Sequence, residues 1–319
     1  MQLQHIVTIC LAGAAAAEYR YAIDRASCRG AMYDKVKHYV EVSQRQSQLV
    51  VDRFGPYLED PDFRPNDRIM AAFRTNFPND DISTVRNVHG VYEQITRYTY
   101  YDVDVRTDES YRDKRDGKDL RLSTSGTLTD ASPLGLKEIF CNADHIIKDE
   151  SRNEKNIHWF DTAQMVPVVD GDPLLSLKDP TSNSVTLVTK DSRSWTKDQG
   201  WPEHAPGVIA FHPRILKAYV DKNTRFDSDR LNRALSPTLL DGIKRAHPRL
   251  RDFKPVHILR TPEFTMLQEM THMIVTVETD DDDGGYRLPD GIALFALMVD
   301  LIENYKYEVD EEGKLIRIH

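Results

Sequence analysis

The segment TMLQEMTHMI, residues 265–274, carries side chains whose types and spacing could do chemistry. Gln268 and His272 are four residues apart, so on an α-helix both would project from the same side, with Glu269 beside them. In the motif H-E-x-x-H, two imidazoles at this spacing hold zinc, and the glutamate takes a proton from the metal-bound water. Here glutamine stands where the first imidazole would be. The segment predicts either an altered zinc-site helix or a core helix with a buried histidine.

An acidic stretch follows this helix in the sequence VETDDDDGGYRLPDG, and an apolar segment that ends in LIENY comes next. Within the acidic stretch, Asp283 precedes Tyr286 by three residues. Together with the Q-E-x-x-H helix, this pattern resembles the aspzincin metallopeptidases, the group of deuterolysin and the lysine-specific metalloendopeptidases. The resemblance covers residues 256–307. It implies a zincin-like fold and a zinc-dependent peptidase ancestry.

The resemblance also implies a role for each motif residue. Asp283 would be the third zinc ligand, and Tyr286 would help to stabilise the oxyanion. Glu269 would be the general base, and His272 would be an imidazole ligand. Zinc is the only cofactor that the resemblance implies.

The chain departs from the family's pattern in two places. In the turn, which reads G-T-x-D-x-x-Y-G in the family, Asp280 and Asp281 replace the first Gly and Thr, and Arg287 replaces the last Gly. In the helix, Gln268 replaces the first histidine. A carboxamide oxygen is a weaker electron donor than imidazole, and zinc sites are built from Cys, His and carboxylate groups. We therefore expect zinc to be held weakly or not at all.

Three functions are compatible with such a site. The chain could be a metal-dependent endopeptidase that uses Gln268, His272 and Asp283 as ligands and Glu269 as the general base. Without metal, Glu269, His272 and Tyr286 could act as an acid/base cluster on a small molecule. The cleft could also be inactive and bind a peptide or another partner. We expect a metallopeptidase-like protein with weak or lost peptidase activity, whose cleft serves small-molecule chemistry or binding.

Residues 1–17 resemble a secretory signal, because they contain no charged residue, carry an apolar stretch and end in three alanines. A buried N-terminal helix is the alternative. No later apolar run is long enough to span a bilayer, so we expect a secreted protein without a membrane anchor after signal removal. The net charge of −9 argues against a nucleic-acid partner. The serine-hydrolase and nucleotide-binding glycine motifs are absent from the sequence.

Two cysteines, Cys28 and Cys141, remain after the predicted signal, which contains Cys10. In an exported chain an even pair predicts one disulfide that closes a long loop. Two free buried cysteines are the alternative.

The order of predicted elements indicates an α+β fold. Apolar residues at helical spacing predict helices over residues 31–55, 70–77 and 85–98, the first of them ending at Gly55-Pro56. Strand-forming residues characterise the middle of the chain, in YYDVDVRT, LKEIFCNA and SVTLVTK. Helices return after Asp227.

We expect a helix-rich N-terminal part and a helix-rich C-terminal part around a small sheet with long loops. Residues 18–319 would form one zincin-like domain, with an N-terminal lobe at 18–225 and a C-terminal lobe at 226–319. The site helix, near 262–276, would be the floor of a cleft between the lobes. His204, His212 and His257 have no spacing that marks them as ligands.

Overall fold

The structure is a computed structural model. It describes residues 20–60, 62–63, 65–77, 81–107, 136–148, 157–162, 166–169, 173–178, 188–190, 207–222, 226–246, 254–274 and 288–319. Helices and a small, mostly parallel sheet occur in one chain, which confirms the predicted α+β class. The predicted signal over residues 1–17 lies outside the described residues.

Three helices follow the first strand. They are α1 (Ala31–Glu59), α2 (Asp67–Asn76) and α3 (Ile82–Thr96). The side chain of Asn66 accepts a hydrogen bond from the Arg68 backbone N–H at the start of α2, and Asp81 does the same for Thr84 in α3. These side chains satisfy backbone donors that a helix start leaves free. All three predicted helices are therefore present.

The predicted end of the first helix at Gly55-Pro56 was wrong, because α1 continues to Glu59 with Pro56 inside it. Proline disfavours a helix interior because it lacks an N–H and its ring crowds the preceding turn. Here Phe54 and Tyr57 are both buried in the core next to the proline. The packing of these two rings holds the last turn in place despite the proline.

A five-stranded sheet lies beside these helices, in the strand order β2-β1-β3-β8-β7. Its first four strands run parallel, and β7 is antiparallel to β8. Parallel neighbours need long crossover connections, which α1, α2 and α3 supply between β1 and β2. The strands are β1 (Arg20–Ile23), β2 (Thr99–Tyr100), β3 (Leu136–Phe140), β7 (Val188–Lys190) and β8 (Gly207–Ala210).

The prediction of a strand over YYDVDVRT was mostly wrong, because only its first residue belongs to β2. The carboxylate of Asp104 accepts hydrogen bonds from the backbone N–H groups of Arg106 and Thr107, at 2.9 and 3.1 Å. Aspartate favours turns because it bonds to backbone groups two residues on. β3 covers LKEIF, the first five residues of LKEIFCNA, and β7 covers VTK at the end of SVTLVTK, whose first four residues lie outside the described ranges.

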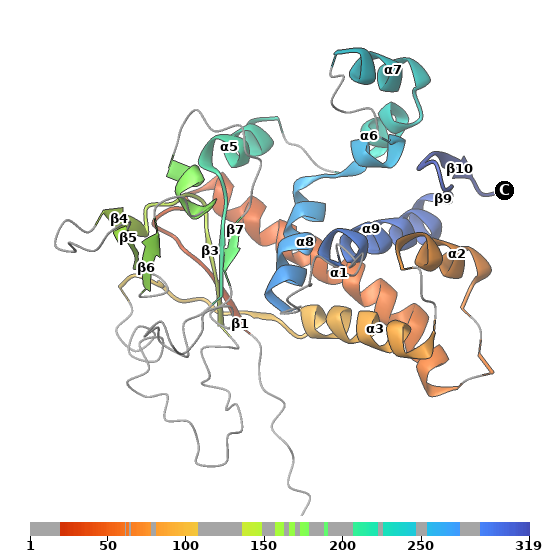
Figure 1. Cartoon of the computed structure of the whole chain (residues 1–319), viewed down its shortest axis with the longest axis horizontal. Coiled ribbons are helices and arrows are strands. Elements are labelled where there is room, and N and C mark those ends of the chain that lie inside the picture. The colour runs from red at the N-terminus through yellow and green to blue at the C-terminus, as the bar shows by residue number, and fades with distance from the viewer. Residues whose placement is uncertain are drawn as a thin grey trace, which may run out of the picture.

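A three-stranded antiparallel sheet packs on the other side of the five-stranded sheet from the helices (Figure 1). It contains β4 (Ile146–Lys148), β5 (Ile157–Asp161) and β6 (Val166–Val169), and the short 3-10 helix η2 (Pro173–Lys178) follows it. Ile146, Val168 and Leu177 share a small second core with Phe140 and Ala210 of the larger sheet. This second core attaches the three-stranded sheet to the five-stranded one.

Residues on the opposite face of the five-stranded sheet belong to the main core. Side chains alternate between the two faces of a strand. Ile23, Ile139 and Ile209 accordingly join the helices in the main core, while Ala22 and Phe140 point into the second core. The central strand β3 nevertheless carries two charged residues, Lys137 and Glu138, and both are buried.

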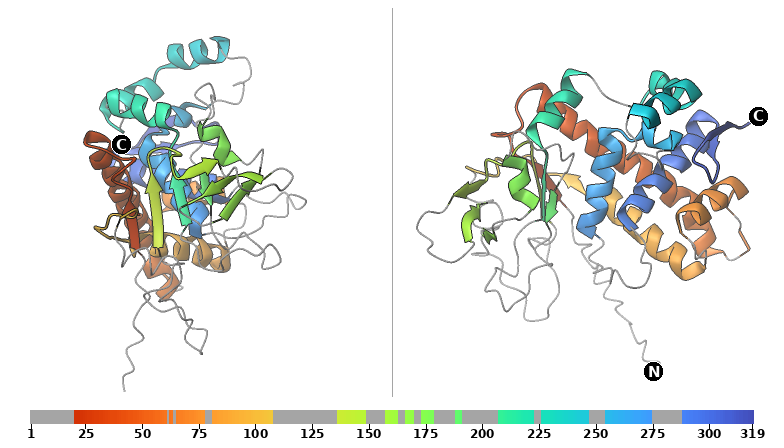
Figure 2. Two further views of the ribbon diagram at one scale, coloured as in Figure 1. Left: turned by 90° about the vertical axis from the view of Figure 1, so that its left-hand side faces the viewer. Right: turned by 45° about the horizontal axis from the view of Figure 1, so that its top comes forward.

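The C-terminal part of the chain adds further helices and a hairpin. They are α5 (Pro213–Asp221), α6 (Ser228–Ala234), α7 (Pro237–Ala246), η6 (Pro255–Leu259), α8 (Pro262–Ile274), α9 (Leu288–Asp300) and η8 (Leu301–Tyr305), followed by the hairpin β9 (Tyr307–Val309) and β10 (Leu315–Arg317). Both α8 and α9 contact α1, and Figure 2 shows the three helices side by side. Gln46 of α1 donates to Asp300 of α9 at 2.9 Å.

The predicted disulfide is confirmed. Cys28 and Cys141 are joined with an S–S distance of 1.99 Å. Cys28 follows β1 and Cys141 follows β3, so the bond ties together the ends of two adjacent parallel strands. Both residues are buried.

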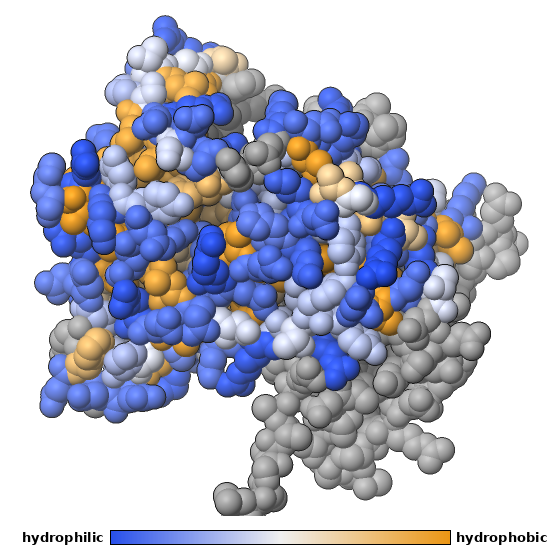
Figure 3. Space-filling model, turned by 180° about the vertical axis from the view of Figure 1, so that it is seen from behind, coloured by the Kyte–Doolittle hydropathy of each residue, from blue (hydrophilic) through white to orange (hydrophobic). Residues whose placement is uncertain are grey.

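The rear surface of the molecule is mainly hydrophilic (Figure 3). Apolar side chains gather at its upper left, at the end of the molecule that carries α6 and α7. In the described part of the chain, no helix is both long enough and apolar enough to cross a membrane.

Candidate functional site

The predicted site helix is present as α8, and its apolar side chains fix it in the main core. Phe264, Met266, Leu267 and Met270 are all buried there. The helix begins at Pro262, a residue that suits the first helical position because the missing N–H would have no partner. The packing against α1 and α9 therefore gives the motif residues a fixed backbone.

The motif side chains of α8 differ in burial. Gln268 is half-buried and His272 is exposed, one turn apart on the least buried side of the helix, as the spacing predicted. Glu269 is only 6 % exposed, at the edge of the buried side. Glu269, the expected general base, is therefore more enclosed than the imidazole of His272.

A third group, Asp290 at the start of α9, lies near His272. The pKa of His272 is below its ordinary value, because surrounding atoms partly desolvate the imidazole, and the carboxylate of Asp290 opposes this effect. The same carboxylate also opposes the lowered pKa of His257, which is caused first by desolvation and then by Arg260 and Lys254. Asp290 is thus close enough to both imidazoles to act on their charge.

Sequence reasoning missed Asp290 as a site residue. Its Oδ1 atom is buried and has no hydrogen-bond partner within the described ranges. A buried carboxylate oxygen without a partner is unusual, because burying polar groups is unfavourable unless they are bonded. The available signal was the sequence PDG at the start of the closing apolar helix, where an acidic residue also suits the helix dipole.

The described residues do not by themselves fit a zinc centre. No group of three or more His, Cys, Asp or Glu side chains that could hold a metal occurs among them. Gln268 offers a neutral amide oxygen, which is outside the usual zinc ligand set. Asp283 and Tyr286, the ligand and the oxyanion group implied by the family resemblance, lie outside the described residues.

A hollow of about 520 Å³ lies on the surface of α7. It is lined by Ser236, Thr238, Leu239, Gly242, Ile243 and Ala246. None of the motif residues lines it, so this hollow is not the predicted cleft above α8.

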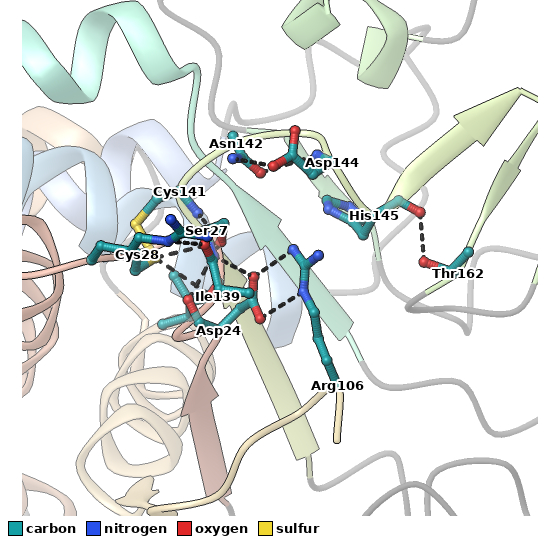
Figure 4. Close-up of polar contacts among 12 residues, drawn as sticks. Asp24, Ser27, Cys28, Arg106, Ile139, Cys141, Asn142, Asp144, His145 and Thr162 are labelled. Carbon is teal, nitrogen blue, oxygen red and sulfur yellow. Dashed lines mark hydrogen bonds and ion pairs between the residues drawn. A yellow bond between two sulfur atoms is a disulfide. The ribbon is translucent and has the colours of Figure 1, made fainter. Parts of the chain in front are cut away.

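A second polar cluster lies at the carboxyl ends of the parallel strands, away from the motif helix. Asp24 follows β1 directly and is completely buried. Its carboxylate accepts two hydrogen bonds from the guanidinium of Arg106, at 2.9 and 2.7 Å, and a third from the Ser27 backbone N–H at 2.9 Å (Figure 4). A bidentate charged pair of this kind is stronger than a neutral hydrogen bond.

We expect Arg106→Ala to lower the free energy of unfolding by about 2 kcal/mol, because it leaves a buried carboxylate without its cation. Arg106 itself is 34 % exposed, which places the effect below that of a fully buried pair. Chemical denaturation measures the change. Lys217→Ala, which breaks the exposed i,i+4 pair with Asp221, is the control and should change stability by about 0.5 kcal/mol or less. Equal effects of the two variants would contradict this prediction.

His145 lies next to this pair and is also nearly completely buried. Its ring stacks on Phe140 at a centroid distance of 4.0 Å, and the Arg106 guanidinium lies 5.9 Å from the same Phe140 ring. Neither ring nitrogen of His145 has a hydrogen-bond partner in the part of the chain that the structure describes. No local sequence pattern indicates this environment, because the residues that surround His145 come from separate segments.

No protein-family model, curated protein or solved structure matches the chain.

Proposed function

We propose that the chain is a secreted, metallopeptidase-like protein of zincin-like fold whose peptidase activity is weak or lost. In this proposal, the side of α8 that carries Gln268 and His272 binds a peptide or a small molecule bearing an amide. Zinc-dependent hydrolysis is not its role.

One observation carries the proposal. α8 holds Gln268 one turn before His272 on its least buried side, at the position where a zinc peptidase needs a second imidazole. The packing of α8 against α1 and α9 leaves little freedom to bring a different donor to this position by rotating the helix. The burial of Glu269 is a second support, because a general base must reach a water molecule beside the substrate.

The chemistry of the two outward side chains suits an amide ligand. The carboxamide of Gln268 has both a donor and an acceptor, so it can pair with a peptide group, which has the same two functions. The neutral imidazole of His272 also offers one donor and one acceptor. A lowered pKa keeps His272 neutral at physiological pH.

A second candidate is the metal-dependent endopeptidase that uses Gln268, His272 and Asp283 as ligands and Glu269 as the general base. The negative charge of Asp290 favours it, because it acts on the His272 imidazole and would also attract a cation to this side of α8.

Cleavage of an unfolded protein substrate in the presence of zinc separates the two candidates. We expect the native chain to cleave no faster than Glu269→Gln, because no water is activated on α8. Gln268→His is the matched variant that restores the family's ligand. Cleavage by the native chain that disappears in Glu269→Gln would establish the endopeptidase and overturn the proposal.

Binding of fluorescent random-sequence peptides to the zinc-free chain tests the proposed role directly. We expect Gln268→Ala to weaken binding by about tenfold, as the loss of one hydrogen-bonding side chain implies. Thr238→Ala, on the exposed surface of α7, should leave binding unchanged. Peptide binding that is absent, or that survives both Gln268→Ala and His272→Ala, would contradict a peptide-binding role for this side of α8.

A further inference from the structure

The environment of His145 joins two layers of the fold. Its ring stacks on Phe140, the last residue of β3, inside the second core that attaches the three-stranded sheet. Its backbone carbonyl accepts hydrogen bonds from the N–H and the hydroxyl of Thr162, at 2.9 and 2.7 Å, directly after β5. His145 thus contacts the five-stranded sheet through its ring and the three-stranded sheet through its backbone.

The ring of His145 is 3 % exposed and lacks hydrogen bonds to both nitrogens among the residues described. In its neutral form the imidazole packs as a flat, weakly polar ring against Phe140. A proton would turn it into a buried cation whose ring N–H groups have no hydrogen-bond partner among the described residues, which is unfavourable.

Four charged groups face His145 from different elements. Asp161 of β5 and Asp24 after β1 favour a positive charge on the ring, whereas Arg106 after β2 and Lys178 of η2 oppose it. Asp24 and Arg106 already neutralise each other through their bidentate contact. Figure 4 shows the His145 ring turned toward this pair. Burial is the largest of the effects on the ring, ahead of Asp161, and it lowers the pKa of His145.

We propose that His145 is a pH-sensitive latch that holds the three-stranded sheet on the five-stranded sheet at neutral pH and releases it in mild acid. The latch is independent of the proposed function of α8, because none of its residues belongs to the motif helix. Release would loosen β4, β5 and β6 while the disulfide and the main core keep the helices together.

The pH range follows from the direction of the shift. Burial lowers the pKa of His145 below the ordinary value of 6.5, so the folded form is neutral where the unfolded form begins to bind a proton. The attachment is then fully stable above pH 6.5 and weakens as the pH falls from 6.5 toward the lowered pKa. Uptake of one proton changes the equilibrium between the attached and the released three-stranded sheet by at most about tenfold per pH unit.

Hydrogen exchange of the full-length chain at pH 7.5, 6.5 and 5.5 tests the latch, with rates corrected for the intrinsic effect of pH. We expect the protection of peptides from β4 and β5 to fall as the pH decreases in the native chain, by up to about tenfold per pH unit below 6.5. Protection of α1 should remain unchanged. His145→Phe keeps a ring on Phe140 and cannot bind a proton, so its protection should be flat with pH.

Two further variants make the result decisive. His145→Gln also lacks a titrating group, and it serves as the alternative variant if the phenylalanine ring of His145→Phe does not fit. His38→Gln removes an exposed histidine of α1 and should keep the pH response of the native chain. The proposal is overturned if native β4 and β5 show no loss of protection, or if a folded His145 variant loses protection to the same extent.

Discussion

Replacing both Cys28 and Cys141 by serine is expected to lower the free energy of unfolding by about 4 kcal/mol. The disulfide joins residues separated by 113 positions, and a cross-link that closes a long loop removes much of the entropy of the unfolded chain. It also fixes the carboxyl ends of β1 and β3 next to each other. Urea denaturation of the native chain and the double serine variant measures the loss.

The reducing agent provides the control for this prediction. Full reduction of the native chain should lower its stability to that of the double serine variant, and the same agent should leave the variant unchanged. If fully reduced native protein lost less than about 1 kcal/mol, the loop that the disulfide closes would contribute little to the stability of this fold.

Phe295→Ala is expected to lower the free energy of unfolding by about 4 kcal/mol, as is usual for removing a buried phenylalanine ring. Phe295 lies in α9 and is completely buried. Its ring contacts the rings of Phe54, Phe73 and Phe77, with centroid distances of 5.6, 5.4 and 5.8 Å. The substitution would leave a cavity where α1, α2 and α9 meet.

Phe63→Ala is the matched control, because it removes the same atoms from a residue that is 41 % exposed. We expect it to change stability by about 0.5 kcal/mol or less. Thermal or chemical denaturation compares the two variants. Similar losses for Phe63→Ala and Phe295→Ala would show that the aromatic cluster is not the centre of the helical core.

The elements with strong local signals could be predicted from the sequence. α8 follows from Pro262 at its start and apolar residues at helical spacing, and α3 follows in the same way. α1 continues beyond Pro56 because the aromatic residues on both sides of the proline are buried against residues that are distant in the sequence. Local rules describe the proline correctly but contain no information about the α2 and α9 residues that contact Phe54.

The parallel sheet and its polar cluster could not be predicted. β1 contains only four residues, and its partners lie about a hundred residues further along the chain, so no local pattern reveals the pairing. Asp24, Arg106 and His145 are brought together only by this pairing. Asp290 was missed for a related reason, because its nearness to His272 depends on how α9 packs beside α8.

The predicted geometry of Gln268 and His272 was accessible from the sequence, because helical spacing alone determines it. The burial of Glu269 was not, because it depends on the helices that surround α8.

The zinc content of the native chain, measured after dialysis against a buffer with equimolar zinc and a weak chelator, tests the proposed function most directly. We predict well below one equivalent of zinc in the native chain. Gln268→His should bind zinc at least about tenfold more tightly, because a direct metal ligand should contribute no less affinity than an outer-shell partner does. One tightly held equivalent in the native chain, lost in His272→Ala, would show that the amide can replace the imidazole and would contradict the proposal.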